Sequence, residues 1–189
     1  ATQITGQMAR YYNLPMRSSN ACTANAPDGQ AMWESLNSLW ASTTSGTNLV
    51  YHGAGWLDGG LIASYEKFVM DCEVLQQFKR YFEPELCSVT EDDLAFEAIS
   101  EVGPTGHFFG CQHTQDRYTN AFYSPFLSDW RNYEAWAEAG EEWTHVKANK
   151  IWKAILNEFE PPPIDEGIKE ELASFVDRRI KEGGAPTDF

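Results

Sequence analysis

Apolar residues recur along the chain at two spacings, which predict helices joined to short strands. Between Met32 and Thr43 the apolar positions lie three or four residues apart, as on one face of an α-helix. A similar stripe predicts a long helix over about residues 60–82. The short runs at residues 14–19 and 48–52 are predicted to be adjacent parallel strands joined through the helix that contains Met32 and Trp40. The second run ends in glycines, as buried parallel strands often do.

Helices dominate the rest of the predicted structure. Ser128 is expected to cap a helix over residues 128–160, with an interruption near Gly140. Three consecutive prolines at 161–163 form a stiff linker, and apolar residues at helical spacing then predict a final amphipathic helix. We therefore divide the chain into residues 1–160, with βα units and covering helices, and residues 161–189, with the linker and the last helix.

The order of these elements predicts an α/β fold. Two βα units do not close a parallel sheet, because such a sheet needs more strands and a cover on both faces. We interpret the chain as the C-terminal part of a TIM-type (β/α)8 barrel, helix-rich and with extra C-terminal helices. In such barrels the reactive groups lie on the loops that follow the strands.

Charge and cysteine content narrow the classes of partner. The chain has 28 acidic and 14 basic residues and a formal charge of -14, which disfavours nucleic acid and anionic membranes as partners. A cationic substrate would be attracted, although the same acidity also serves solubility. The four cysteines show no zinc-ligand spacing, so we expect no metal site and a cytoplasmic protein with reduced thiols.

Two loops carry the first candidate site residues. Arg17 and Asn20 belong to the loop region around the first predicted strand, and His52 and Trp56 follow the second. Arg17 either clamps a carboxylate or packs its stem on the surface. His52 serves either as an acid, a base or a hydrogen-bond donor, or as a satisfied polar group at a strand end.

An aromatic segment after residue 106 supplies the other candidates: Phe108, His113 and Tyr118. A trimethylammonium group has no hydrogen-bond donor and binds through the faces of aromatic rings. The alternative is a cluster that only packs helices together. We expect these rings to lie near the loops bearing Arg17, Asn20, His52 and Trp56.

Several stretches have the order and spacing of a known family. They are Leu14-Pro15, Pro27-Asp28-Gly29-Gln30-Ala31, Gly46 to Val50 with Gly53-Ala54-Gly55, Ser64 to Asp71, Val102 to Thr114 and Trp136 to Gly140. On these residues the chain resembles the C-terminal portion of the trimethylamine methyltransferase family. The resemblance covers nearly the whole chain and implies a barrel in a longer polypeptide, so that this chain alone is an incomplete enzyme.

The resemblance also implies an activity and a partner. Members of the family move a methyl group from a tertiary or quaternary amine to the cobalt of a separate corrinoid (cobalamin) protein, so no cofactor is expected on this chain itself. Trimethylamine-specific members carry pyrrolysine, at a position expected near residues 20–26, where only standard residues stand. We therefore favour a donor such as glycine betaine, with Arg17 as the candidate for its carboxylate, and we expect a homo-oligomer.

Two further hypotheses belong to other classes of protein. One is a non-catalytic module that captures quaternary amines or docks a corrinoid protein. The other is a small all-helical structural protein, which predicts no parallel pairing between residues 14–19 and 48–52.

Overall fold

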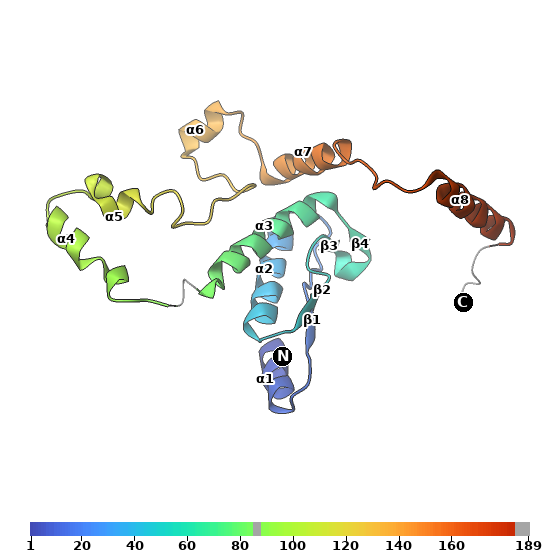
Figure 1. The fold of residues 1–189 in the computed structure, drawn as a ribbon, viewed down its shortest axis with the longest axis horizontal. Coiled ribbons are helices and arrows are strands. Elements are labelled where there is room, and N and C mark those ends of the chain that lie inside the picture. The colour runs from blue at the N-terminus through green and yellow to red at the C-terminus, as the bar shows by residue number, and fades with distance from the viewer. Residues whose placement is uncertain (85–87, 184–189) are drawn as a thin grey trace. The chain divides into compact units, whose positions relative to one another are not determined.

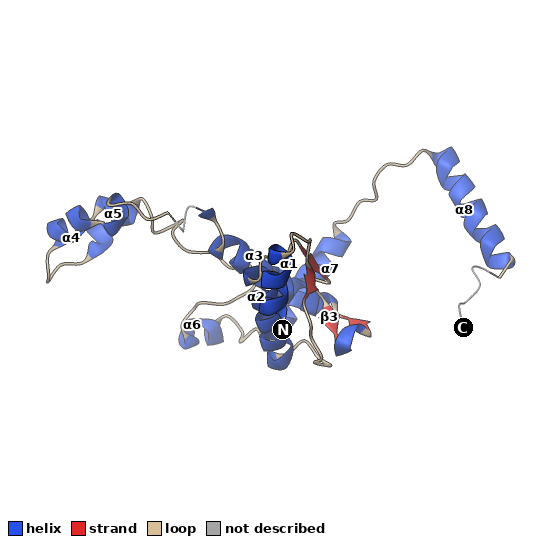
Figure 2. Cartoon of the chain, turned by 90° about the horizontal axis from the view of Figure 1, so that it is seen from below, coloured by secondary structure: helices blue, strands red, loops and turns tan. Residues whose placement is uncertain are grey.

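The computed structural model describes residues 1–84 and 88–183 (Figure 1). Cys87, one of the cysteines in the prediction of reduced thiols, lies outside the described residues. The chain divides into two compact units, Ala1–Ala154 and Ile155–Phe189. Helices make up most of the ordered elements in both units (Figure 2).

The first unit opens with a βα arrangement. Helix α1 (Thr2–Tyr11) precedes strand β1 (Arg17–Ser19), helix α2 (Gly29–Thr44) and strand β2 (Leu49–Tyr51). The two strands pair in parallel, with Arg17 opposite Leu49 and Ser19 opposite Tyr51. This confirms the predicted parallel pairing and contradicts the all-helical hypothesis.

Helix α2 has sequence signals at both ends. The Asp28 side chain accepts hydrogen bonds from the backbone N–H groups of Gln30 and Ala31, as a helix N-cap does. Gly46 follows the last turn with a φ of 73°, a left-handed conformation that glycine adopts at little cost. Leu39 in the middle of the helix is completely buried.

The two-stranded sheet has one covered and one open face. Val50 packs against a buried cluster of Leu39, Val74 and Phe78 from α2 and helix α3 (Tyr65–Tyr81). The alternate positions Leu49 and Tyr51 are 56% and 47% exposed, because successive strand residues point to opposite faces. The strands among the described residues form two two-stranded sheets, so they do not close a barrel.

The prediction of a helix from residue 60 was wrong at its start. Strands β3 (Trp56–Leu57) and β4 (Ile62–Ala63) pair antiparallel, joined by a 3-10 turn, η1 (Asp58–Gly60). Helix α3 begins only at Tyr65, because the side chain of Ser64 accepts a hydrogen bond from the Lys67 N–H and caps it.

Carboxylates on α3 attach later segments of the chain. Glu73 accepts hydrogen bonds from the backbone N–H groups of Phe126, Leu127 and Ser128 at 3.1, 3.0 and 3.4 Å. Glu66 accepts from Asn149 Nδ2 at 2.6 Å and from Trp152 Nε1 at 2.8 Å. These bonds border an apolar cluster of Val69, Met70, Leu127 and Ala148.

The predicted helix over residues 128–160 begins later than expected and ends earlier. The segment forms helix α6 (Tyr133–Glu138), capped by the Asn132 side chain, and helix α7 (Thr144–Asn157). The expected interruption near Gly140 is confirmed, since Gly140 and Glu141 both have positive φ between the helices. The elements described between α3 and α6 are short: η3 (Asp92–Leu94), α4 (Phe96–Val102), η4 (Phe108–Gly110) and α5 (Gln112–Gln115).

The second unit contains the predicted amphipathic helix, α8 (Glu166–Lys181). Asp165 caps it by accepting from the N–H groups of Gly167 and Ile168. The unit begins within α7, ahead of the three prolines that we expected to form the linker. No helix in the described ranges is long and apolar enough to cross a membrane.

Glu66 allows a test of how α7 is held. The hydrogen bonds from Asn149 and then Trp152 lower the pKa of its carboxyl to about 2. Because the folded pKa lies below the ordinary value, this stabilisation is present above about pH 4.5 and is lost as the pH falls towards about 2. We expect Glu66→Gln to cost on the order of 1 kcal/mol at pH 7 and progressively less on acidification, as measured by urea unfolding.

The control is Glu138→Gln, at an exposed position on α6. A stability difference between wild type and Glu66→Gln that is constant from pH 7 to pH 3 would contradict the role assigned to the Glu66 charge.

Candidate functional site

A row of one cation and three rings runs from the open face of the sheet to the hairpin. The guanidinium carbon of Arg17 lies 5.0 Å from the ring centroid of Tyr51. The ring centroids of Tyr51 and His52 are 3.9 Å apart, and those of His52 and Trp56 are 4.4 Å apart. The structure thus brings together three of the sequence-predicted site residues, and we call this set the ring row.

The ring row borders a groove of about 350 Å³. His52 and Trp56 line one part of it, and residues 60–63 of the hairpin line the other. Gly60 has a φ of 94°, and a Cβ added there would lie 1.8 Å from the indole nitrogen of Trp56. A glycine at this position therefore lets the Trp56 ring lie against the hairpin backbone.

Sequence reasoning missed Tyr51. The alternation of side chains along the second strand could have identified it. Val50 is oriented towards the helices, so its neighbours Leu49 and Tyr51 lie on the opposite face of the sheet, together with Arg17. Arg17 is exposed, and apart from its contact with the Tyr51 ring its guanidinium group forms no hydrogen bond or ion pair with any residue in the described ranges. Its guanidinium group is therefore accessible to an external anion.

Asn20 occupies a different environment from the ring row. Its side chain is completely buried. Its Nδ2 donates to the Gly53 carbonyl at 3.2 Å and to Asp71 Oδ2 at 3.3 Å, and its Oδ1 accepts from Ser38 Oγ at 3.1 Å. Asn20 therefore supports the loop that bears His52 and Trp56, and its amide is not presented to a ligand.

A buried ion pair lies behind the same loop, and sequence reasoning missed it. Lys67 Nζ is 2.5 and 2.6 Å from the two carboxylate oxygens of Asp71 and donates to Ser35 Oγ at 2.6 Å. Asp71 Oδ2 also accepts from the Gly55 N–H at 2.9 Å. Burial raises the pKa of Asp71, while the Lys67 ammonium opposes that shift. The sequence feature that could have revealed this ion pair is two opposite charges four residues apart within an apolar helical stripe.

Phe108, His113 and Tyr118 lie on η4, on α5 and just after α5. Their hydrogen bonds are local: Phe108 O accepts from the Cys111 N–H, His113 O from Arg117, and the Tyr118 N–H donates to Thr114 O. No hydrogen bond or ring contact among the described residues joins them to the ring row.

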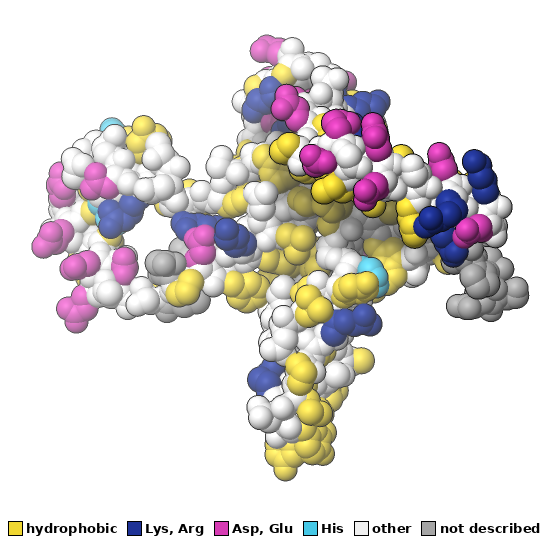
Figure 3. Space-filling model, turned by 45° about the vertical axis from the view of Figure 1, so that its right-hand side comes forward, with side chains coloured by type: hydrophobic (Ala, Val, Ile, Leu, Met, Phe, Trp, Pro, Cys, Tyr) yellow, Lys and Arg dark blue, Asp and Glu magenta, His cyan; other side chains and the backbone are white. Residues whose placement is uncertain are grey.

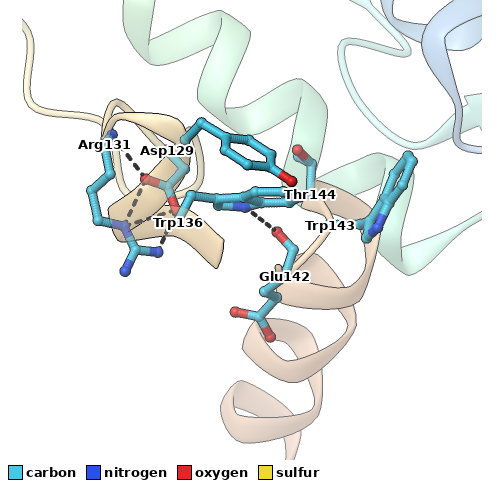
Figure 4. A pocket seen from close by; sticks show the side chains of 7 residues that line it. Asp129, Arg131, Trp136, Glu142, Trp143 and Thr144 are labelled. Atoms are coloured by element: carbon cyan, nitrogen blue, oxygen red, sulfur yellow. Dashed lines mark hydrogen bonds and ion pairs between the residues drawn. The ribbon is translucent and has the colours of Figure 1, made fainter. Parts of the chain in front are cut away.

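A second groove, of about 380 Å³, lies beside α6 and the start of α7 (Figure 4). It is lined by the rings of Tyr133, Trp136 and Trp143 together with Asp129 and Glu142. The two carboxylates already have partners: Arg131 donates to Asp129, lowering its pKa to about 2, and Lys150 forms an ion pair with Glu142. This groove therefore offers rings but no uncompensated charge.

The residues in the described ranges contain no group of three or more His, Cys, Asp or Glu side chains that could hold a metal ion. Burial raises the thiol pKa values of Cys22 and Cys72, which favours the protonated form over the thiolate that binds metals. Many large apolar side chains are exposed elsewhere on the surface, and Figure 3 shows them in several patches.

Comparison with known proteins gives a consistent assignment. The sequence profile of the family described as trimethylamine methyltransferase (MTTB) matches residues 1–184. A glycine betaine methyltransferase of Desulfitobacterium hafniense is 38% identical over 181 residues, which cover 95% of this chain and 37% of the relative.

Two trimethylamine methyltransferases are also similar. MttB2 of Methanosarcina mazei is 30% identical over 94% of this chain and 36% of its own length. MttB of Desulfitobacterium hafniense is 31% identical over 94% of this chain and 35% of its own length. The chain thus spans little more than a third of the curated relatives that it matches. Because the family profile matches nearly all of it, the chain belongs to the trimethylamine methyltransferase family.

Proposed function

We propose that the protein containing this chain moves a methyl group from a quaternary amine of the glycine betaine type to the cobalt of a separate corrinoid protein. The observation that carries the proposal is the ring row, in which aromatic faces and an accessible guanidinium group lie side by side. The similarity to a glycine betaine methyltransferase supports it.

The ring row matches the two ends of a betaine. A quaternary ammonium group binds through the faces of aromatic rings such as Trp56, which lies beside the groove next to His52. A carboxylate forms charge-assisted hydrogen bonds with a guanidinium group, which Arg17 provides. Trimethylamine has no carboxylate, so Arg17 favours a betaine as the donor.

The proposed reaction requires little acid–base catalysis from the residues of this chain. The methyl carbon–nitrogen bond breaks, its electron pair stays on nitrogen, and the donor leaves as a neutral tertiary amine. The reduced corrinoid of the partner supplies the nucleophile that accepts the methyl group. The residues of this chain position the methyl group for in-line transfer and exclude water. Such a transfer gains most of its rate from these two effects.

We further infer that additional parallel strands complete a barrel in the intact protein. Helices α2 and α3 cover one face of the β1–β2 sheet, while the face with Arg17, Leu49 and Tyr51 is open. In a (β/α) barrel the covered face is the outer one, and the open face would belong to the interior.

The test is methyl transfer by the intact protein from glycine betaine to a reduced corrinoid protein, followed by the absorbance of the methylated corrinoid and by the formation of dimethylglycine. We expect Trp56→Leu to weaken betaine binding about 2- to 30-fold, because leucine keeps apolar area but removes the ring quadrupole. Trp143→Leu, in the second groove, is the matched control and should leave binding unchanged.

Two outcomes would overturn parts of the proposal. Betaine binding without methyl transfer would support the non-catalytic binding module. Transfer from trimethylamine without any binding of betaine would contradict the choice of donor.

A further inference from the structure

We propose that Asp71 is a positioning residue for the ring row, acting through the backbone of residues 53–55. The proposal rests on the proposed function only where it predicts rates of methyl transfer. Its structural part, that one buried carboxylate sets the conformation of the His52–Trp56 loop, is testable without any activity.

One oxygen atom links the segments that follow both parallel strands. Asp71 Oδ2 accepts from Asn20 Nδ2, directly after β1, and from the Gly55 N–H, directly before Trp56. Asn20 Nδ2 also donates to the Gly53 carbonyl. The loop between the two rings is thus fixed at Gly53 through Asn20 and at Gly55 by Asp71 itself.

The backbone of this loop needs such support. His52 has a φ of 54° and Gly55 a φ of 85°, so the chain passes through the left-handed region twice between β2 and β3. A non-glycine residue in that region is disfavoured unless its surroundings hold it there. The bonds at Gly53 and Gly55 lie within this segment, directly before Trp56, and so hold the backbone that sets how the rings of His52 and Trp56 face each other.

Stability alone does not account for a charged pair at this place. Asp71, Lys67, Asn20 and Ser35 are all completely buried. A buried ion pair gives no general advantage in stability over apolar residues of similar volume, because both charges lose their hydration. Apolar residues, however, have no acceptor for the Gly55 N–H and for Asn20. Holding the site loop is the property that the charged pair supplies and an apolar pair lacks.

Helix α3 offers a matched control in Glu73. This carboxylate is also buried, at 3% exposure, and also accepts backbone N–H groups, but those belong to residues 126–128. A change at Glu73 should therefore affect residues 126–128 and leave the His52–Trp56 loop as it is.

The experiment measures backbone amide hydrogen exchange in the intact protein for two double variants, Lys67→Met/Asp71→Asn and Lys67→Met/Asp71→Leu. Both remove the ion pair together, and Asn and Leu have similar shapes, but only Asn keeps an acceptor oxygen. We expect residues 53–57 to exchange about 10-fold faster in the Leu variant than in the Asn variant, the equivalent of one lost hydrogen bond. Exchange in α2 should be the same in both.

Methyl transfer gives the second readout. The Leu variant should show a lower kcat than the Asn variant for every donor, since a displaced loop misaligns the methyl group whatever the donor's other end carries. Glu73→Gln should raise exchange at residues 126–128 only. Asn20→Ala, which removes the link to Gly53 but keeps the ion pair, should raise exchange at residues 53–57 and decides the question if the Leu variant does not fold.

Equal exchange at residues 53–57 in the Asn and Leu variants, or unchanged exchange in Asn20→Ala, would overturn the inference. Absence of methyl transfer in the wild-type protein would instead contradict the proposed function, and the exchange data would still decide the role of Asp71.

Discussion

Replacing Asp71 alone by leucine is expected to lower the free energy of unfolding by about 3–5 kcal/mol, the cost of leaving one partner of a buried ion pair unpaired. Lys67 is completely buried, and its remaining partner would be the hydroxyl of Ser35. Such an environment does not compensate a full positive charge. The measurement is urea unfolding at pH 7 of the intact protein, followed by circular dichroism.

The companion variant Lys67→Met/Asp71→Leu separates charge from packing. It removes both charges, so we expect part of the lost stability to return, while at least about 1 kcal/mol of the loss remains because the Gly55 N–H and the Asn20 amide keep no acceptor. The comparison forms a double-mutant cycle for two residues in direct contact. A single variant as stable as the double variant would contradict the ion pair described here.

Replacing Arg17 by methionine is expected to weaken the binding of glycine betaine about 10- to 150-fold, since hydrogen bonds to charged groups contribute about 1.5–3 kcal/mol. Binding of tetramethylammonium, which has the cation but no carboxylate, should change less than about 2-fold. Titration calorimetry of both ligands with the intact protein measures the difference.

Arg131→Met is the matched control, because Arg131 already forms an ion pair with Asp129 beside the second groove. It should leave the affinity for both ligands unchanged. An equal loss of affinity for both ligands in Arg17→Met would mean that Arg17 orders the Tyr51 ring and does not bind a carboxylate.

The parallel pairing could be predicted from the sequence because its signals are local. A short apolar run that ends in glycines, and a helix of the right length before it, are properties of neighbouring residues. The β3–β4 hairpin could not be found in this way. Each of its strands has two residues, too few to show a period, and Leu61 and Tyr65 lie at helical spacing.

The candidate site was only partly predictable. Arg17, His52 and Trp56 were identified because they lie in or next to the predicted strands. Asn20 was assigned to the ligand for the same reason, although the structure buries it against Asp71. Its environment depends on a residue 51 positions away, which no local pattern reveals. Lys67 and Asp71 are opposite charges one helical turn apart, which the sequence shows, but their burial depends on α2 and on the loop after β1, which it does not.

The position of Asp71 in the chain has a consequence for synthesis on the ribosome. The acceptor for the Gly55 N–H lies 16 residues further along, and the acceptor for Asn20 lies 51 residues further along. A nascent chain that has emerged only as far as residue 63 therefore contains both parallel strands and every member of the ring row, but not the carboxylate that fixes the loop. The loop between His52 and Trp56 therefore acquires its conformation only after α3 has emerged and packed, and a pause in translation within α3 would leave the ring row exposed before this loop is fixed.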